Sequence, residues 1–151
     1  MNARLCLVIA ALLGFTAVTL GAFAAHGLKD SGFLEKKYAD IPAKTVAGLV
    51  VPASFKYFED FHTAVEYQMS HALALAITGL LLSRQRTKAL SVAAYCFVGG
   101  IVLFSGSLYV LVLGGPRFLG IPWGAITPIG GVLFLAGWLS LAVGVPKNSG
   151  T

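Results

Sequence analysis

Residues 90–113 read LSVAAYCFVGGIVLFSGSLYVLVL, an apolar run without a single charged side chain. A helix of about 20 apolar residues, rising about 1.5 Å per residue, crosses the roughly 30 Å hydrocarbon core of a bilayer. Three further runs of the same character lie at about 5–25, 64–83 and 125–145. The four runs predict a protein that crosses a membrane four times.

The composition supports this class. The chain has 151 residues, of which 57% are hydrophobic and 11% are charged, whereas a soluble domain carries about 25% charged residues. Backbone groups inside a bilayer must be satisfied within the chain, which leaves helices or a closed barrel. Because the runs do not alternate between apolar and polar residues, we expect helices. Residues 1–151 are therefore expected to form one all-α domain.

The basic residues indicate the orientation in the membrane. The formal net charge is +5, but the cations lie between the spans rather than in one patch, so nucleic acid is not an expected partner. One end carries cations and no acid: Arg4, Arg84, Arg86, Lys88 and Lys147. Since basic residues in short loops mark the cytoplasmic side, both termini are expected in the cytoplasm.

The N-terminal sequence bears on the compartment. Residues 5–25 are too long for the 7–15-residue apolar core of a signal peptide, so we expect them to be a span. They carry no Arg- and Ser-rich transit segment, which favours a bacterial inner (cytoplasmic) membrane over the mitochondrial inner membrane.

A long connection, residues 26–61, is expected on the outer side between the first two spans. Its residues 46–55, VAGLVVPASF, are apolar but too short to span, so they are expected to lie at the interface or to dip into the bundle. Phe55, Tyr57, Phe58 and Phe61 are expected to form an aromatic belt before the second span.

Small residues recur every seven positions in three spans. They are Ala3, Ala10, Ala17 and Ala24; Ala93, Gly100 and Ser107; and Gly130, Gly137 and Gly144. A seven-residue repeat keeps one face toward a partner helix, and small residues allow close approach. The pattern predicts a compact left-handed bundle with little room for a large internal cavity.

Polar side chains gather toward the outer ends of all four spans. The candidate binding residues are His26, Glu66, Tyr67, Ser70, His71, Ser105, Ser107, Tyr109 and Thr127. Glu66 to His71 place four of them within an arc of about 140° on one helix, so we expect that face to point into the bundle. His71 is expected roughly 10 Å below the membrane surface.

Three interpretations of this polar layer stay open. It fixes the register of the bundle through interhelical hydrogen bonds, it binds a lipid headgroup, a quinone-like molecule or a small solute, or it moves protons or ions through Glu66 and His71. No metal or haem is expected, because there is no H-x-x-x-H pair and His26 and His71 differ in depth. The absence of a nucleophile–base pair, phosphate loop or paired carboxylates argues against an enzyme.

Four motifs in chain order carry a family resemblance. They are GAFAAHGL (21–28), EYQMSHALAL (66–75), LFSGSLY (103–109) and ITPIGG (126–131), the last followed by Gly137-Trp138. Together they resemble the YgdD-like family, the domain of unknown function 423, which includes animal transmembrane protein 256. The resemblance implies a four-helix integral membrane protein and no established activity, cofactor or substrate. The chain departs from the family pattern at Ala24, where glycine is usual, and in its longer first connection.

The role favoured by these observations is an accessory or scaffold protein that packs against other membrane proteins or against itself. Its small size, small-residue helix faces and extra apolar loop favour this role. A binder or carrier of a lipid, quinone-like molecule or solute is the alternative. Proton or ion transfer is a third alternative, although the inner halves of the spans contain no histidine and no acidic or basic side chain. Membrane lipids are expected partners in each case.

Overall fold

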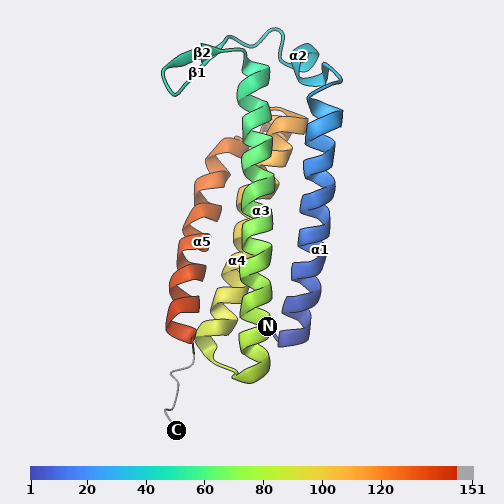
Figure 1. The fold of residues 1–151 in the computed structure, drawn as a ribbon. Coiled ribbons are helices and arrows are strands. Elements are labelled where there is room, and N and C mark those ends of the chain that lie inside the picture. Colours follow the sequence, from blue (N-terminus) through green and yellow to red (C-terminus); the bar gives the residue numbers. More distant parts are fainter. Residues whose placement is uncertain (146–151) are drawn as a thin grey trace.

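Four long helices dominate the structure, a computed structural model that describes residues 1–145. They are α1 (Ala3–Ala22), α3 (Ala53–Arg84), α4 (Lys88–Gly114) and α5 (Trp123–Gly144). Each is long and apolar enough to cross a bilayer, with α1 continuing through a π-helical turn, η1 (Phe23–Leu28) (Figure 1). The predicted class, an all-α protein with four membrane-spanning helices, is confirmed.

Helix α3 is longer than the second predicted span, because it begins at Ala53 rather than near residue 64. Ala53, Tyr57 and Phe61 recur every fourth residue and are all buried, which is the pattern of a helix with one packed face. Tyr57 and Phe61 pack against the first connection and the end of α4. The expected aromatic belt is therefore wrong for these two residues, whose rings face protein rather than lipid.

The first connection contains a short helix, α2 (Phe33–Lys37), and a hairpin of β1 (Lys44–Val46) and β2 (Leu49–Val51). Ala47 and Gly48 form its turn with φ of +50° and +82°, the left-handed pair that closes a two-residue hairpin. Leu49 and Val50 are 68% and 76% exposed. Residues 46–51 therefore do not dip into the bundle, and their expected place at the membrane interface stays a prediction.

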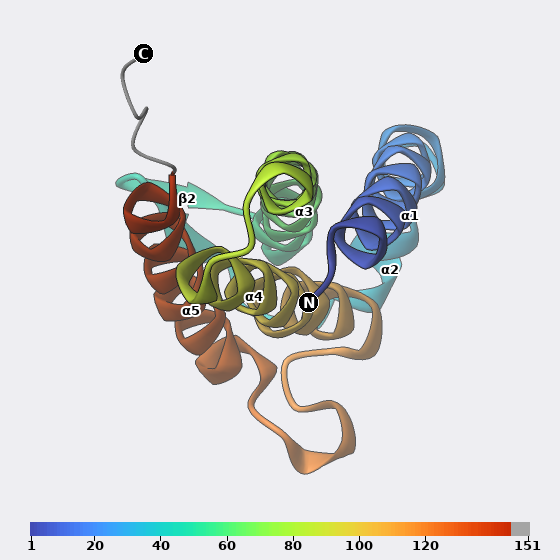
Figure 2. The same cartoon turned by 90° about the horizontal axis from the view of Figure 1, so that it is seen from below.

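The helices pack in the order α1, α3, α4, α5. Seen along the bundle, α3 and α4 are central while α1 and α5 flank them (Figure 2). The two central helices share one continuous core with the inner faces of the flanking helices. Because α5 packs chiefly on α4, the side of α3 that faces α5 is left incompletely covered.

The predicted heptad faces are buried. Of the residues named above, all are buried except Ala3, which is half-buried. Each of the three glycines of α5 lies directly against a large residue of α4: Gly130 contacts Phe104, Gly137 contacts Phe97 and Gly144 contacts Leu90. Successive contacts are seven residues apart on each helix and run in opposite directions along the two helices. This confirms that small residues allow α4 and α5 to pack closely. The handedness of the bundle stays a prediction.

The two ends of the molecule differ. The start of α1, the α3–α4 turn and the end of α5 share one end. The opposite end carries α2, the hairpin and the α4–α5 connection with its 3-10 turn, η2 (Phe118–Gly120) (Figure 1). The chain thus enters and leaves the bundle on the same side.

Candidate functional site

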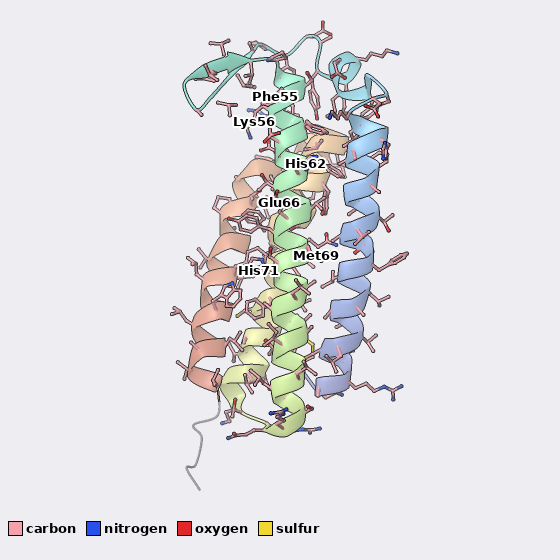
Figure 3. All side chains as sticks on the ribbon, in the orientation of Figure 1. Phe55, Lys56, His62, Glu66, Met69 and His71 are labelled. Carbon is pink, nitrogen blue, oxygen red and sulfur yellow. The ribbon has the colours of Figure 1, made fainter. Side chains whose placement is uncertain are left out.

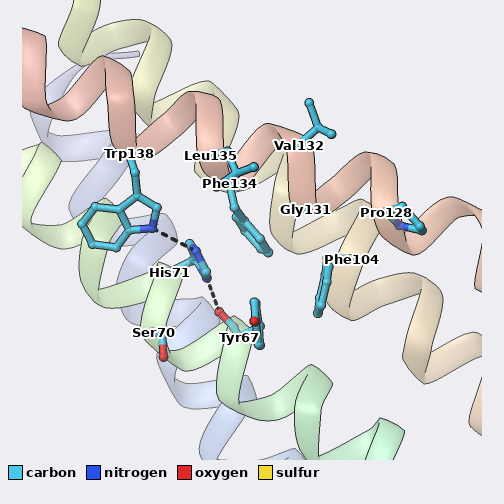
Figure 4. A pocket seen from close by; sticks show the side chains of 10 residues that line it. All are labelled: Tyr67, Ser70, His71, Phe104, Pro128, Gly131, Val132, Phe134, Leu135 and Trp138. Carbon is cyan, nitrogen blue, oxygen red and sulfur yellow. Dashed lines mark hydrogen bonds between the residues drawn. The ribbon is translucent and has the colours of Figure 1, made fainter.

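A groove of about 630 Å³ runs between α3 and α5, with α4 as its floor. It is lined by Tyr67, Ser70, His71, Phe104, Pro128, Gly131, Val132, Phe134, Leu135 and Trp138 (Figure 4). Val132 and Leu135 are about two-thirds exposed at its rim. The groove therefore opens sideways, toward the position that lipid occupies around a membrane protein.

His71 lies at the centre of this groove and is only 6% exposed. Its Nδ1 lies 2.8 Å from the carbonyl oxygen of Tyr67, and the indole Nε1–H of Trp138 donates to its Nε2 at 3.2 Å. An indole can only donate, so Nε2 must carry a lone pair and Nδ1 must carry the proton. Both ring nitrogens of a neutral imidazole are thus engaged.

Aromatic rings surround His71. Its ring stacks on Phe134 with centroids 3.5 Å apart and planes inclined by 13°. Tyr67 stacks on Phe104 with centroids 4.5 Å apart, and Phe97 meets Trp138 edge-on at 5.4 Å. Of these rings, Tyr67 and Trp138 are 42% and 47% exposed, whereas His71, Phe134 and Phe97 are buried behind them.

Two hydroxyl groups lie in the same groove. Tyr67 is 42% exposed, and Ser70 is also exposed. Within the described part of the chain, neither side-chain oxygen has a hydrogen-bond partner. These hydroxyls leave the otherwise apolar groove with two points at which a ligand could form a directional bond.

A separate polar network lies on the side of α3 that faces α1 and α4. The Gln68 amide donates to the Leu13 carbonyl at 2.9 Å and to the Thr16 hydroxyl at 2.8 Å. Its oxygen accepts a bond of 2.9 Å from the Tyr109 hydroxyl. Gln68 is 4% exposed, so this network joins α1, α3 and α4 inside the protein.

The predicted polar layer is therefore divided among several places. His71, Tyr67 and Ser70 line the groove, while Tyr109 belongs to the Gln68 network. Ser107 and Thr127 bond each other at 2.8 Å between α4 and α5. The structure thus does not bring all the candidates together as one cluster.

The remaining candidates lie elsewhere. Ser105 is fully buried and its hydroxyl has no partner among the described residues. Glu66 is exposed, and His26 is exposed at the end of η1, 3.8 Å from Asp30. Figure 3 shows Glu66 and His71 on the side of α3 away from α1, whereas Met69 faces α1. The expectation that this polar face points into the bundle is wrong for Glu66 and Ser70.

Sequence reasoning missed three important side chains: Gln68, Phe134 and Trp138. Gln68 is not ionisable, and at 100° per residue it lies outside the arc formed by Glu66, Tyr67, Ser70 and His71. A signal for Trp138 was present, because tryptophan in a membrane span normally lies at the interface and needs a partner for its N–H. A tryptophan deep within a span predicts a buried acceptor, which here is His71.

Potential metal-ligating side chains lie scattered over the described residues. Within residues 1–145, no three His, Cys, Asp or Glu side chains come together as a set of metal ligands. Cys6 and Cys96 are free thiols in that same part of the chain. The chemistry available in the groove consists of stacking, apolar contact and hydrogen bonds from two hydroxyls.

Comparison with known proteins places the chain in a family. The profile of a family described as "Protein of unknown function (DUF423)" matches residues 20–131. A UPF0382 membrane protein of Staphylococcus epidermidis is 39% identical over 149 residues, covering 97% of this chain and 99% of the relative. No solved structure matches the chain.

Two further relatives come from other bacteria. The UPF0382 inner membrane protein YgdD of Escherichia coli is 39% identical over 149 residues, covering 95% of this chain and 91% of the relative. The UPF0382 membrane protein YwdK of Bacillus subtilis is 35% identical over 145 residues, covering 95% and 98%. These similarities extend over nearly the whole length of each protein, and they confirm the resemblance carried by the four motifs. The chain is therefore a member of the DUF423 family and a multi-pass membrane protein.

Proposed function

We propose that this protein binds a lipid-soluble molecule with a flat ring, such as a quinone-like compound, in the groove between α3 and α5. The observation that carries the proposal is a groove that opens sideways and is lined by two exposed aromatic rings, Tyr67 and Trp138, on either side of the buried His71 and Phe134. A flat ring can pack against the exposed Tyr67 and Trp138 rings, and aromatic pairs gain about 0.5–1.5 kcal/mol beyond their buried area.

The size and polarity of the groove support this ligand class. Its volume of about 630 Å³ lies within the range of about 300–1,000 Å³ typical of small-molecule sites. The Tyr67 and Ser70 hydroxyls supply the few polar groups that such sites use for orientation. An oxygen on the ring would accept a bond from either hydroxyl.

A binding role is better supported than proton transfer or catalysis. The proton on His71 Nδ1 is held by the Tyr67 carbonyl, and the Nε2 lone pair is held by Trp138. Moving a proton through this imidazole would require breaking both bonds. Glu66, the other group invoked for proton transfer, is exposed rather than paired with His71.

The chain offers an internal reporter for the test, because it has two tryptophans. Trp138 lines the groove, whereas Trp123 lies at the start of α5. Short-chain ubiquinone would be titrated into purified Trp123→Phe and Trp138→Phe proteins in detergent while tryptophan fluorescence is recorded. The proposal predicts saturable quenching of Trp138 and only linear, collisional quenching of Trp123.

A groove-filling variant provides the control. Gly131 lines the groove and a Cβ there has its nearest neighbour at 4.0 Å, so Gly131→Leu should fill the groove without disturbing the fold. Gly14→Leu makes the same change in a shallow depression between α1 and α3, where a Cβ meets nothing within 4 Å. Saturable quenching that persists in Gly131→Leu would refute a site in the groove.

The accessory role remains a second candidate, and the hairpin favours it. Leu49 and Val50 project from β2 into the surroundings, and the two short strands pair with each other. An exposed apolar hairpin with open edges is a typical docking element. Replacing Leu49 and Val50 with serine should release partner proteins from mild-detergent extracts. Unchanged co-elution would count against this role.

For the orientation, we propose that both termini and the α3–α4 turn face the cytoplasm of a bacterial cell. The support is the set of cations at that end, Arg4, Arg84, Arg86 and Lys88, without an acid among them. The relative from E. coli is named an inner membrane protein, which agrees with the proposed location.

A further inference from the structure

The turn between α3 and α4 holds an unusual accumulation of positive charge. Arg84 is in the last turn of α3, Arg86 is in the connection, and Lys88 is the first residue of α4. All three are exposed. Arg4, near the start of α1, belongs to the same end of the bundle.

The start of α4 is electrostatically unfavourable by itself. A helix N-terminus carries a partial positive charge and is stabilised by acidic side chains. Here the first turn of α4 contains Lys88 and no acid. The Thr87 side chain caps the Leu90 N–H at 3.1 Å but adds no negative charge. An anion from outside the chain would remove this conflict.

A depression of about 470 Å³ lies at this place and is lined by Arg86, Thr87, Lys88, Ser91, Val92 and Tyr95. Lys88, Val92 and Tyr95 follow the spacing i, i+4, i+7 and so share one face of α4. Val92 and Tyr95 are about half or more exposed. Cations thus lie at the end of the apolar helix, and an apolar and aromatic strip extends about 10 Å from them along α4.

This combination matches one class of ligand. We propose that the depression holds an anionic phospholipid, with its phosphate between Arg86 and Lys88 and its glycerol and first acyl carbons along Val92 and Tyr95. Paired cations and nearby hydroxyls recognise a phosphate. The apolar strip distinguishes a lipid from a free phosphate, which would use only the charged end.

The test measures lipid selectivity on the intact protein. Purified protein in neutral detergent is mixed with equal amounts of dioleoyl phosphatidylglycerol and dioleoyl phosphatidylcholine, and bound lipid is counted by native mass spectrometry. For two cations near the membrane surface, we expect an enrichment of the anionic lipid of about 5- to 30-fold. Equal retention of the two lipids would overturn the proposal.

Matched charge variants locate the site. Arg86→Gln with Lys88→Gln should abolish the enrichment. Arg117→Gln with Lys36→Gln removes the same two residue types from the opposite end, where both are exposed, and should keep it. Loss in both double variants would show a bulk charge effect and overturn the site. Displacement of the lipid by millimolar inorganic phosphate would overturn the choice of a lipid.

A single variant keeps the proposal testable if the double variant does not fold. Lys88→Glu supplies the missing acid to the first turn of α4. It should raise Tm in lipid-free detergent by about 1–4 °C and abolish the phosphatidylglycerol enrichment. An unchanged Tm would contradict the unfavourable charge at the start of α4, and retained enrichment would contradict the lipid site.

Discussion

At the scale of single residues, Gln68 joins three helices through its amide, and Tyr109 supplies one of the bonds. Tyr109→Phe removes this bond and leaves the Gln68 oxygen without its donor. We expect a loss of about 1 kcal/mol in the free energy of unfolding, measured by reversible unfolding in mixed micelles. Tyr95→Phe, the same change at an exposed position of α4, should cost nothing measurable.

The coupling between the two residues gives the stricter test. In a Gln68→Leu background the Tyr109→Phe change should cost much less than in the natural chain, because the acceptor is already gone. Equal costs in the two backgrounds would show that the bond contributes nothing to stability.

Neighbouring glycines on α5 make a second prediction at this scale. A Cβ on Gly130 would lie 2.4 Å from the backbone nitrogen of Phe104, whereas one on Gly131 has its nearest neighbour at 4.0 Å. Gly130→Ala should therefore force α4 and α5 apart and cost about 2–3 kcal/mol, and Gly131→Ala should be tolerated. The same unfolding measurement checks both, and similar costs would refute the close approach of these helices.

Individual polar residues show how far the sequence could predict the candidate site. Spacing placed Glu66, Tyr67, Ser70 and His71 on one face of α3, and all of these except Glu66 line the groove. The direction of that face could not be read from spacing, because His71 is buried together with Tyr57, Phe61 and Gln68 whereas Tyr67 and Ser70 are exposed. An uncharged amide in an apolar run gives no signal until its partners on other helices are known.

At the scale of elements, Tyr38 anchors the connection between α1 and α3 to the end of α4. Its hydroxyl donates to the carbonyl oxygens of Val112 at 2.7 Å and of Leu111 at 3.2 Å, and its ring stacks on Tyr57. Tyr38→Phe should loosen this connection and speed its cleavage by an added protease. Tyr57→Phe, which keeps the stacked rings, should leave cleavage slow; equal rates in the two variants would contradict the anchoring role.

The same bond has a predictable pH dependence. Burial, together with the nearby Tyr57 and Asp60, raises the pKa of Tyr38 above its ordinary value of about 10. A group whose pKa is raised in the folded state stabilises fully below its unfolded pKa and loses that contribution as pH rises. Protection of the connection from protease should thus be constant near neutrality and decline only above about pH 10, and a change near pH 7 would contradict this assignment.

Some elements were predictable and others were not. Length and hydropathy located all four spans, because a bilayer imposes both requirements on every helix. The outer end of α3 and the hairpin were missed. Residues 53–61 contain both charged and aromatic side chains, which hides the helical period in the sequence. The period becomes clear only once Ala53 and Phe61 are known to be buried. The hairpin depends on a left-handed Ala47, which sequence alone does not favour.

At the scale of the whole molecule, the order of the helices creates the groove. The seven-residue repeats of small residues predicted which face of each helix packs, but they did not predict which neighbouring helix packs on that face. Helix α5 packs on α4 rather than over α3, and this arrangement leaves Tyr67 and Trp138 exposed along the groove (Figures 2 and 4). Partner choice depends on the fit of whole surfaces, which local spacing does not encode.

The orientation of the whole molecule is testable by thiol labelling. In a chain with Cys6 and Cys96 replaced by alanine, a cysteine at Leu49 lies on the hairpin and one at Gln85 lies in the α3–α4 turn. In intact spheroplasts a membrane-impermeant maleimide should label Leu49→Cys and leave Gln85→Cys unlabelled until lysis. The reverse pattern would place both termini outside the cytoplasm.

The central claim, that the α3–α5 groove holds a ring-bearing lipid, is tested most directly by what the protein carries from its own membrane. Lipid extracts of the purified natural chain, Gly131→Leu and Gly14→Leu would be compared by mass spectrometry at equal protein amounts. We predict that a ring-bearing, lipid-soluble compound is present near one per chain in the natural protein and in Gly14→Leu, and is lost from Gly131→Leu. The same extract from all three proteins, or one without such a compound, would contradict the claim.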